Sequence, residues 1–111
     1  MVKIAEIIRI NKKFGGALLN KDNLEFDIQM ANEEKNIFKS NAYIIRGIIV
    51  SHSFLDGNKR TALEVISKRF SKEGVKCDEE KLLKGIINIA KDNISDVDKI
   101  SKRIRKWCIK Y

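Results

Sequence analysis

The second half of the chain shows the apolar spacing of helices. Between Asn58 and Glu73, apolar side chains recur every three or four residues and charged side chains fall between them. This pattern predicts an amphipathic helix. Its apolar face consists of Ala62, Leu63, Val65, Ile66 and Phe70. Gly74 follows directly, where glycine commonly ends a helix.

Two more helices are predicted after Gly74. Asp78 is a typical N-cap residue, and the segment after it has one apolar face, made of Leu82, Leu83, Ile86, Ile89 and Ala90. Ser95 with Asp98 three residues later matches a capping box and predicts the start of the last helix. That helix has a narrower apolar stripe, made of Val97, Ile100, Ile104, Trp107 and Cys108.

The first half is also predicted to be helical. Residues 36–51 are mostly apolar, contain no proline, and have Gly47 as their only glycine, which predicts a central helix buried by its neighbours. Asp22 or Asn23 is expected to cap a helix that runs from position 24 to about 34. Residues 2–13 form a further predicted helix, although their isoleucines are spread around its circumference.

These segments together predict the fold class. No segment alternates between apolar and polar residues for long enough to build a sheet. We therefore expect an all-α fold, a compact bundle of about six helices, formed by a single domain over residues 1–111.

Composition agrees with one globular domain. The chain has 111 residues, of which 43% are hydrophobic, so it has enough apolar surface to form a core. No apolar stretch reaches the length of a membrane span and the start lacks a secretory signal pattern. Cys77 and Cys108 show neither metal-ligand spacing nor a disulfide-rich context. We therefore expect reduced thiols and a cytoplasmic protein.

The net charge of +8 favours anionic partners, namely nucleic acid, a nucleotide or an acidic protein. The last predicted helix contributes many of the cations: Lys99, Lys102, Arg103, Arg105, Lys106 and Lys110. The chain is rich in lysine, isoleucine and asparagine together, a combination that genome base composition alone can produce. The charge therefore does not choose among these partners.

The residues from His52 to Ala62 carry the candidate chemistry. His52 is the only histidine, and histidine is the side chain that most often serves as a general base. Gly57 precedes the predicted start of a helix, where backbone N–H groups bind phosphate readily. Arg60 adds a bidentate donor and Lys59 a point charge.

Asp56 is the only carboxylate in this loop. Mg²⁺ in nucleotide sites is usually bound by one or two carboxylates and by phosphate oxygens, so Asp56 is the candidate magnesium ligand. Phe54 is interpreted as a structural anchor that buries the loop.

Each of these residues also has an ordinary interpretation. Asp-Gly-Asn is a common turn, a histidine near a helix end is usually a cap or a surface residue, and Lys-Arg is usually a solvated face. However, cations in a first helical turn oppose the helix dipole, and a bound anion removes that conflict. The combination therefore favours a phosphate site.

The segment from His52 to Arg60 resembles the signature of the Fic/Doc (Fido) family, His-Pro-Phe-x-Asp-Gly-Asn-Gly-Arg. Its ending, Asn58-Lys59-Arg60-Thr61-Ala62, is similar to the Doc, or death-on-curing, branch, where lysine replaces the second glycine. Weaker similarities to short Doc-type toxins extend from Phe14-Gly15-Gly16 to Ile94-Ser95-Asp96, which covers essentially the whole chain.

The resemblance implies a bundle of about six helices and a role for each motif residue. His52 would be the general base for a target hydroxyl and Asp56 the magnesium ligand. The phosphates of ATP would be bound by Gly57, Asn58, Lys59 and Arg60.

Fic enzymes mostly transfer AMP to a protein hydroxyl, whereas Doc enzymes transfer the γ-phosphoryl group to a translation elongation factor. Because Lys59 fills and charges the place of a glycine, we expect a Doc-like Mg-ATP-dependent kinase that acts on a Ser/Thr hydroxyl. AMP transfer is the first alternative. The second is a non-catalytic module that binds nucleic acid through the last helix, which the aromatic content of 7% and the lack of a recognisable motif disfavour.

Two departures from the family pattern bear on rigidity and control. Ser53 stands where the signature has proline, which predicts a less rigid loop. The Ser/Thr-x-x-x-Glu-Gly/Asn segment that inhibits some Fic proteins is not found. We therefore expect inhibition in trans by an antitoxin, with an acidic or disordered segment that folds on the basic last helix and the exposed groove. No membrane partner is expected.

Overall fold

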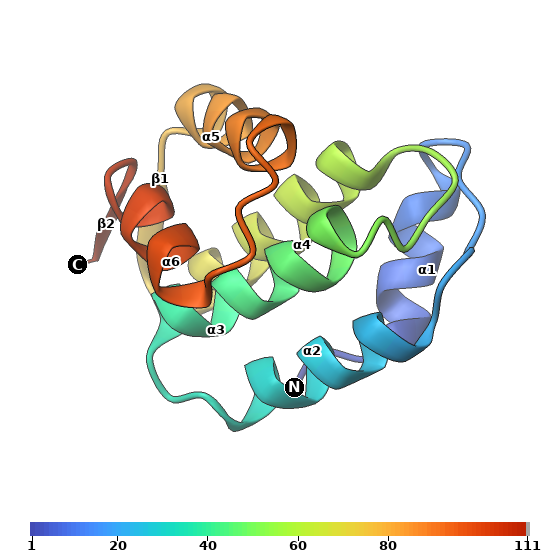
Figure 1. Cartoon of the computed structure of the whole chain (residues 1–111). Coiled ribbons are helices and arrows are strands. Elements are labelled where there is room, and N and C mark those ends of the chain that lie inside the picture. The colour runs from blue at the N-terminus through green and yellow to red at the C-terminus, as the bar shows by residue number, and fades with distance from the viewer. Residues whose placement is uncertain (111) are drawn as a thin grey trace.

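The computed structural model describes residues 1–110, and Tyr111 of the predicted domain lies outside the described residues. Within them the chain is mainly helical, as predicted (Figure 1). The elements follow in the order α1 (Ile4–Lys12), α2 (Asp22–Glu33), α3 (Ile37–Ile45), η1 (Arg46–Val50), α4 (Asn58–Lys72), β1 (Val75–Cys77), α5 (Glu79–Lys91), α6 (Val97–Arg105) and β2 (Cys108–Lys110). No helix among residues 1–110 combines the length and the apolarity needed to cross a bilayer.

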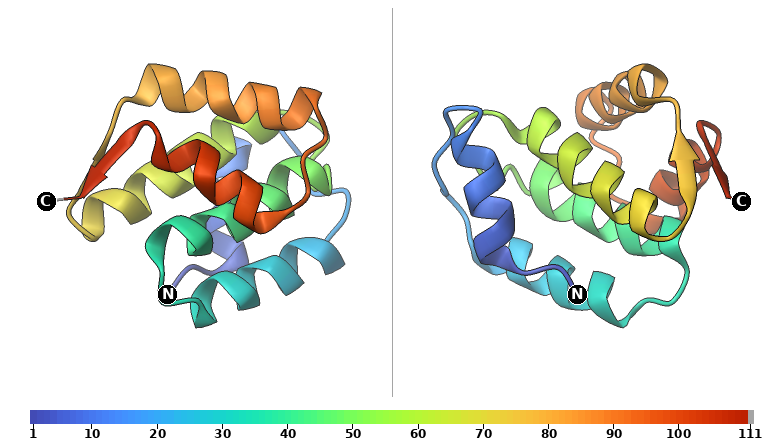
Figure 2. Two further views of the ribbon diagram at one scale, coloured as in Figure 1. Left: turned by 60° about the vertical axis from the view of Figure 1, so that its left-hand side comes forward. Right: turned by 180° about the vertical axis from the view of Figure 1, so that it is seen from behind.

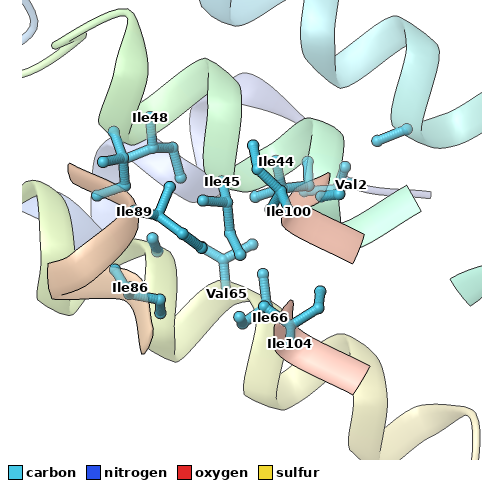
Figure 3. Packing of buried hydrophobic residues seen from close by; sticks show 14 of the residues in the cluster. Val2, Ile44, Ile45, Ile48, Val65, Ile66, Ile86, Ile89, Ile100 and Ile104 are labelled. Carbon is cyan, nitrogen blue, oxygen red and sulfur yellow. The ribbon is translucent and has the colours of Figure 1, made fainter. Parts of the chain in front are cut away.

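The helices α3 and α4 form the centre of the bundle, with α2 on one side and α5 on the opposite side (Figures 1 and 2). Ile44 and Ile45 of α3 are 1% and 0% exposed. Figure 3 shows them beside isoleucines of α4 and α6. Each such fully buried side chain stabilises the fold by about 1.5–3 kcal/mol. The prediction that this central helix is buried by its neighbours is therefore confirmed.

The same helix departs from the prediction in its last turn. Asn36 is the N-cap, and its side chain accepts hydrogen bonds from the N–H groups of Phe38 and Lys39. After Ile45 the helix widens into the π-helix η1. Two features accompany this change: Arg46 pairs with the buried Asp27 (Nη2 to Oδ1, 2.6 Å), and a Cβ at position 47 would lie 2.9 Å from the Cβ of Asp27. Glycine at this position therefore lets η1 pack closely on α2.

Several predicted helix ends are confirmed and two are corrected. Asp78 caps α5 by accepting from the N–H of Lys81 at 3.2 Å, and Gly74 follows α4 with φ +71°. The last helix is capped by Asp96 instead of Ser95, because the Asp96 carboxylate reaches the N–H of Lys99 at 3.1 Å. The helix α2 already begins at Asp22 and has no side-chain cap.

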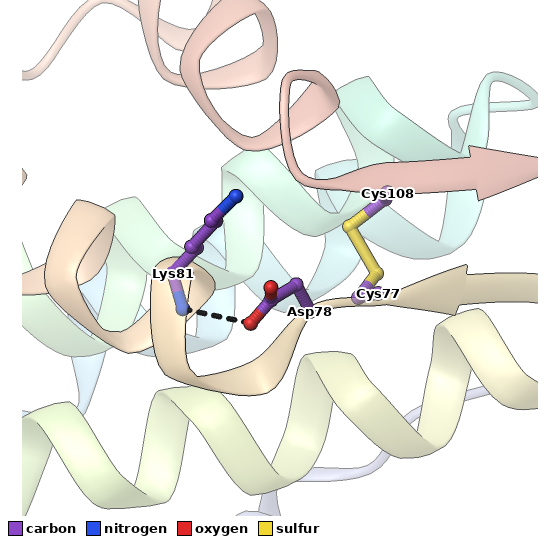
Figure 4. Close-up of a disulfide and its surroundings, with 4 residues drawn as sticks. All are labelled: Cys77, Asp78, Lys81 and Cys108. Atoms are coloured by element: carbon purple, nitrogen blue, oxygen red, sulfur yellow. Dashed lines mark hydrogen bonds between the residues drawn. A yellow bond between two sulfur atoms is a disulfide. The ribbon is translucent and has the colours of Figure 1, made fainter.

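The predictions of no sheet and of reduced thiols were wrong. β1 and β2 pair antiparallel with Cys77 opposite Cys108, and the two cysteines form a disulfide (Figure 4). Each strand has only three residues, which is too short for an alternating pattern to be recognised. The predicted apolar stripe of α6 was also too long: α6 ends at Arg105, and Cys108 belongs to β2.

The C-terminal turn is fixed on α5 by two further contacts. The N–H of Asp78 donates to the carbonyl of Trp107 at 2.8 Å. The indole ring of Trp107 lies directly over Gly85 of α5, where a Cβ would overlap the ring. The position of α5, which forms one wall of the site described next, is therefore fixed by the segment around the disulfide.

Candidate active site

The candidate loop runs from η1 to the start of α4 and is anchored by Phe54. This side chain is 0% exposed, as its predicted structural role requires. Residues 17–20 lie alongside the loop and bind its backbone. The N–H of Leu55 donates to the carbonyl of Ala17 at 2.8 Å, and the N–H of Leu19 donates to the carbonyl of Ser53 at 2.8 Å. The loop is thus attached to the segment between α1 and α2.

Ser53 has an unexpected structural role. It is 0% exposed, and its hydroxyl donates to the carbonyl of Gly47 in η1, while its N–H donates to the carbonyl of Ile48 at 3.2 Å. A proline in this position provides neither donor. The expected loss of rigidity is therefore offset by two hydrogen bonds that join the loop to the π-helix.

Asn58 closes the loop with its side chain. Its Oδ1 accepts from the N–H of Phe54 at 3.1 Å, and its Nδ2 donates to the carbonyl of Phe54 at 2.8 Å. In this arrangement both ends of the Asn58 carboxamide are bound to the backbone of Phe54 within the loop.

A cleft of about 830 Å³ brings the predicted site residues together. Its lining includes all six of them: His52, Asp56, Gly57, Asn58, Lys59 and Arg60. This volume lies within the range of small-molecule sites, about 300–1,000 Å³. The sequence motif therefore corresponds to one continuous surface.

The opposite wall of the cleft comes from α5 and was not predicted. It consists of Leu83, Ile87, Ala90 and Lys91 of α5, with Asn93 from the turn that follows the helix. The sequence contained a partial signal, because positions 83, 87 and 90 fall on one helical face beside the buried face of Leu82, Ile86 and Ile89. Ile87 is 41% exposed. The cleft thus has an apolar wall facing a polar one.

The polar wall is suited to an anion. Gly57 has φ +73° and is followed by the first turn of α4, which no side chain caps. The first N–H groups of this fifteen-residue helix therefore remain available, and they carry the positive end of the helix dipole. Lys59 and Arg60 are exposed in the same turn. A phosphate here would offset the unfavourable placement of two cations at a helix N-terminus.

Asp56 is the carboxylate at this wall. It is exposed, and its Oδ1 accepts from the N–H of Gly57 at 2.7 Å. Among residues 1–110 no cluster of three or more His, Cys, Asp or Glu side chains could bind a metal. A single carboxylate fits Mg²⁺ that is shared with nucleotide phosphates, because such magnesium keeps several waters and needs few protein ligands.

His52 lies at the mouth of the cleft in an uncommon conformation. It has φ +51°, is exposed and lines the cleft. Its N–H donates to the carbonyl of Ile49 at 3.2 Å, directly after the π-helix. Positive φ at a non-glycine residue is uncommon, and such residues concentrate at functional sites. The turn therefore presents the imidazole to whatever occupies the cleft.

Comparison with known proteins gives one informative match. The model of the Fic/DOC family matches residues 4–68, more than half of the 111 residues, and the match contains the whole loop and most of α4. A search of curated protein sequences finds no significant match. Family members are generally transferases that act on proteins, typically by AMP or phosphoryl transfer, and generally use a nucleoside triphosphate with Mg²⁺. The chain is therefore a Fido-domain protein and belongs to the Fic/DOC family.

Proposed function

We propose that this protein is a Doc-type kinase that transfers the γ-phosphoryl group of ATP to a Ser/Thr hydroxyl of a protein. The observation that carries the proposal is Lys59, the second residue of α4, which lines the cleft beside Arg60. The Fic signature has glycine at this position. A lysine adds a charge and bulk where the Fic arrangement leaves space.

The residues of the cleft have complementary roles in this reaction. The target hydroxyl oxygen attacks the γ-phosphorus, its proton passes to the imidazole of His52, and ADP leaves. Lys59, Arg60 and the N–H groups of the first turn of α4 bind the phosphate oxygens. Asp56 would bind Mg²⁺, which neutralises phosphate charge when it is present. Phosphoryl transfer depends mainly on positioning and electrostatic stabilisation, and these groups supply both.

The apolar wall of α5 suits the remaining part of the nucleotide. Leu83, Ile87 and Ala90 face the cleft and offer a surface for an uncharged ring system, since ligand sites are mostly apolar with a few polar groups that fix orientation. The proposal therefore assigns the phosphates to α4 and leaves α5 for the nucleoside.

We further propose that the target is a translation elongation factor and that a separate antitoxin inhibits the enzyme. The Doc-like ending of the motif supports the target class. Two surface features support the antitoxin: Leu55, 65% exposed at the rim of the cleft, and the basic exposed face of α6. An acidic amphipathic segment could cover both. If expression of this chain did not arrest growth, and a neighbouring gene product neither bound it nor changed its activity, this assignment would fail.

The decisive experiment is transfer from labelled ATP. Purified protein is incubated with Mg²⁺ and a cell extract, in parallel with ATP labelled at the α- or the γ-phosphate. Label transferred to protein only from the γ position supports the kinase. Label from the α position means AMP transfer, the alternative within the family. Absence of both, together with tight binding to nucleic acid that weakens steeply with salt, would favour the non-catalytic alternative.

A further inference from the structure

Asn11 connects α1 to both sides of Gly57. It is the second-last residue of α1 and is only 1% exposed, although its side chain is polar. Its Nδ2 donates to the carbonyl of Asp56 at 2.8 Å and to the hydroxyl of Thr61 at 3.1 Å. These partners come 45 and 50 residues later in the chain. The carboxamide therefore spans the turn from which α4 begins.

The bond to Asp56 fixes a peptide that belongs to the nucleotide site. The carbonyl of Asp56 and the N–H of Gly57 lie in one planar peptide group, so the direction of the oxygen determines the direction of the N–H. Glycine adopts positive and negative φ with similar ease, and Gly57 alone would not prevent this peptide from rotating. Two hydrogen bonds supply the constraint: the Oδ1 of Asp56 accepts from the N–H of Gly57, and the Nδ2 of Asn11 donates to the carbonyl at the other end of this peptide group.

The surroundings leave this carboxamide little freedom. A Cβ at Gly16 would overlap the Oδ1 of Asn11 and the backbone oxygen of Asp56, and a Cβ at Gly57 would lie 2.8 Å from the Cβ of Phe14. The backbone carbonyl of Asn11 accepts from the N–H groups of Phe14 at 2.9 Å and Gly16 at 3.3 Å. Two glycines thus allow the end of α1 to approach the loop closely enough for the Asn11 bond.

We propose that Asn11 is a positioning residue of the nucleotide site. By fixing the Asp56–Gly57 peptide, it sets the direction of the Gly57 N–H, which donates to the Asp56 carboxylate in this structure, and so the place of that carboxylate for Mg²⁺. The inference rests on the proposed function in one respect, because it takes Mg-ATP as the ligand of the site. Residues that orient metal ligands typically change metal affinity or activity by about 10–100-fold when they are mutated, and an effect of this size is expected.

A purely structural role is the competing explanation, and Asn32 provides a matched control. Its side chain also makes two long-range bonds, here both to the backbone of Val2: Oδ1 accepts from the N–H at 3.0 Å, and Nδ2 donates to the carbonyl at 2.9 Å. Asn32 does not line the cleft. Asn32→Ala therefore removes a similar set of bonds away from the site.

The test compares Asn11→Ala and Asn32→Ala in the full chain. The first readout is the NMR chemical shift and exchange rate of the Gly57 amide without ligand. The second is the Kd for Mg-ATP, measured as a function of Mg²⁺ concentration. Asn11→Ala is expected to shift the Gly57 amide, speed its exchange and weaken Mg-ATP binding at least about tenfold. Asn32→Ala is expected to lose stability but to keep both properties.

Asn11→Leu keeps the test decisive if Asn11→Ala does not fold, because it nearly keeps the shape of the side chain and removes the Nδ2 that donates to the carbonyl of Asp56 and to Thr61. Like Asn11→Ala, it should shift the Gly57 amide resonance, speed the exchange of this amide and weaken Mg-ATP binding. The inference would be overturned if the chemical shift and exchange rate of the Gly57 amide stayed unchanged, or if the Asn11 and Asn32 variants bound Mg-ATP equally well. If the wild-type protein bound no Mg-ATP, the proposed function would fail. The Gly57 amide would then decide alone whether Asn11 fixes this peptide.

Discussion

At the scale of single residues, His52 is the group whose chemistry can be isolated most cleanly. Replacement by alanine or asparagine is expected to lower the transfer rate about 10²–10⁴-fold, because the target hydroxyl loses its base. Asparagine is the matched variant, since it tolerates the positive φ of this position. The Kd for Mg-ATP should stay at the wild-type value. Full activity in His52→Asn would show that another group accepts the proton.

Lys59 determines the type of transfer in the proposed mechanism. Lys59→Gly restores the glycine that the Fic signature has at this position and is expected to move the product from phosphorylated towards adenylylated protein. Intact-mass measurement of the target distinguishes the two products directly. Lys59→Met separates size from charge, because it keeps most of the length of the unbranched side chain and removes the ammonium. If Lys59→Gly lost activity without any change of product, the side chain would contribute to phosphate binding only.

At the scale of elements, η1 and the loop are coupled through Ser53. Ser53→Ala leaves the buried carbonyl of Gly47 without the hydroxyl that binds it, and an unsatisfied buried acceptor costs about 1–3 kcal/mol. We expect the free energy of unfolding to fall by this amount in urea titrations. Ser71→Ala, on the exposed side of α4, is the control. Equal stability of the two variants would mean that water replaces the hydroxyl.

Elements also show what the sequence could predict. The helices α4 and α5 follow from apolar spacing, from Asp78 and from Gly74, because these signals are local. The π-turn of η1 accompanies a long-range pair between Arg46 and Asp27, and such pairs leave no periodic trace. For the same reason the motif predicted one wall of the cleft, while the wall from α5 and the bond from Asn11 depend on tertiary packing.

At the scale of the whole molecule, an ion pair and a disulfide join segments that lie far apart in the sequence. Lys13 bonds Glu64 of α4 at 2.7 Å, which lowers the pKa of the Glu64 carboxyl and links the end of α1 to α4. Such a partly exposed pair contributes little, about 0–1 kcal/mol. This contribution is present at neutral pH and is lost as pH falls through the lowered pKa. The disulfide is the stronger link.

The disulfide joins positions 31 residues apart and encloses α5 and α6, so it constrains about a quarter of the unfolded chain. Closing a loop of this length is expected to stabilise the fold by about 3–4 kcal/mol. The urea concentration at the midpoint of unfolding should therefore fall when dithiothreitol is added to the wild type. The double variant Cys77→Ser, Cys108→Ser should have the midpoint of the reduced protein, and dithiothreitol should not change it.

Because α5 forms the apolar wall of the cleft, reduction should also weaken Mg-ATP binding. Thiol titration that found both cysteines free in native protein kept without reductant would contradict the disulfide. It would instead support the reduced thiols predicted from the sequence.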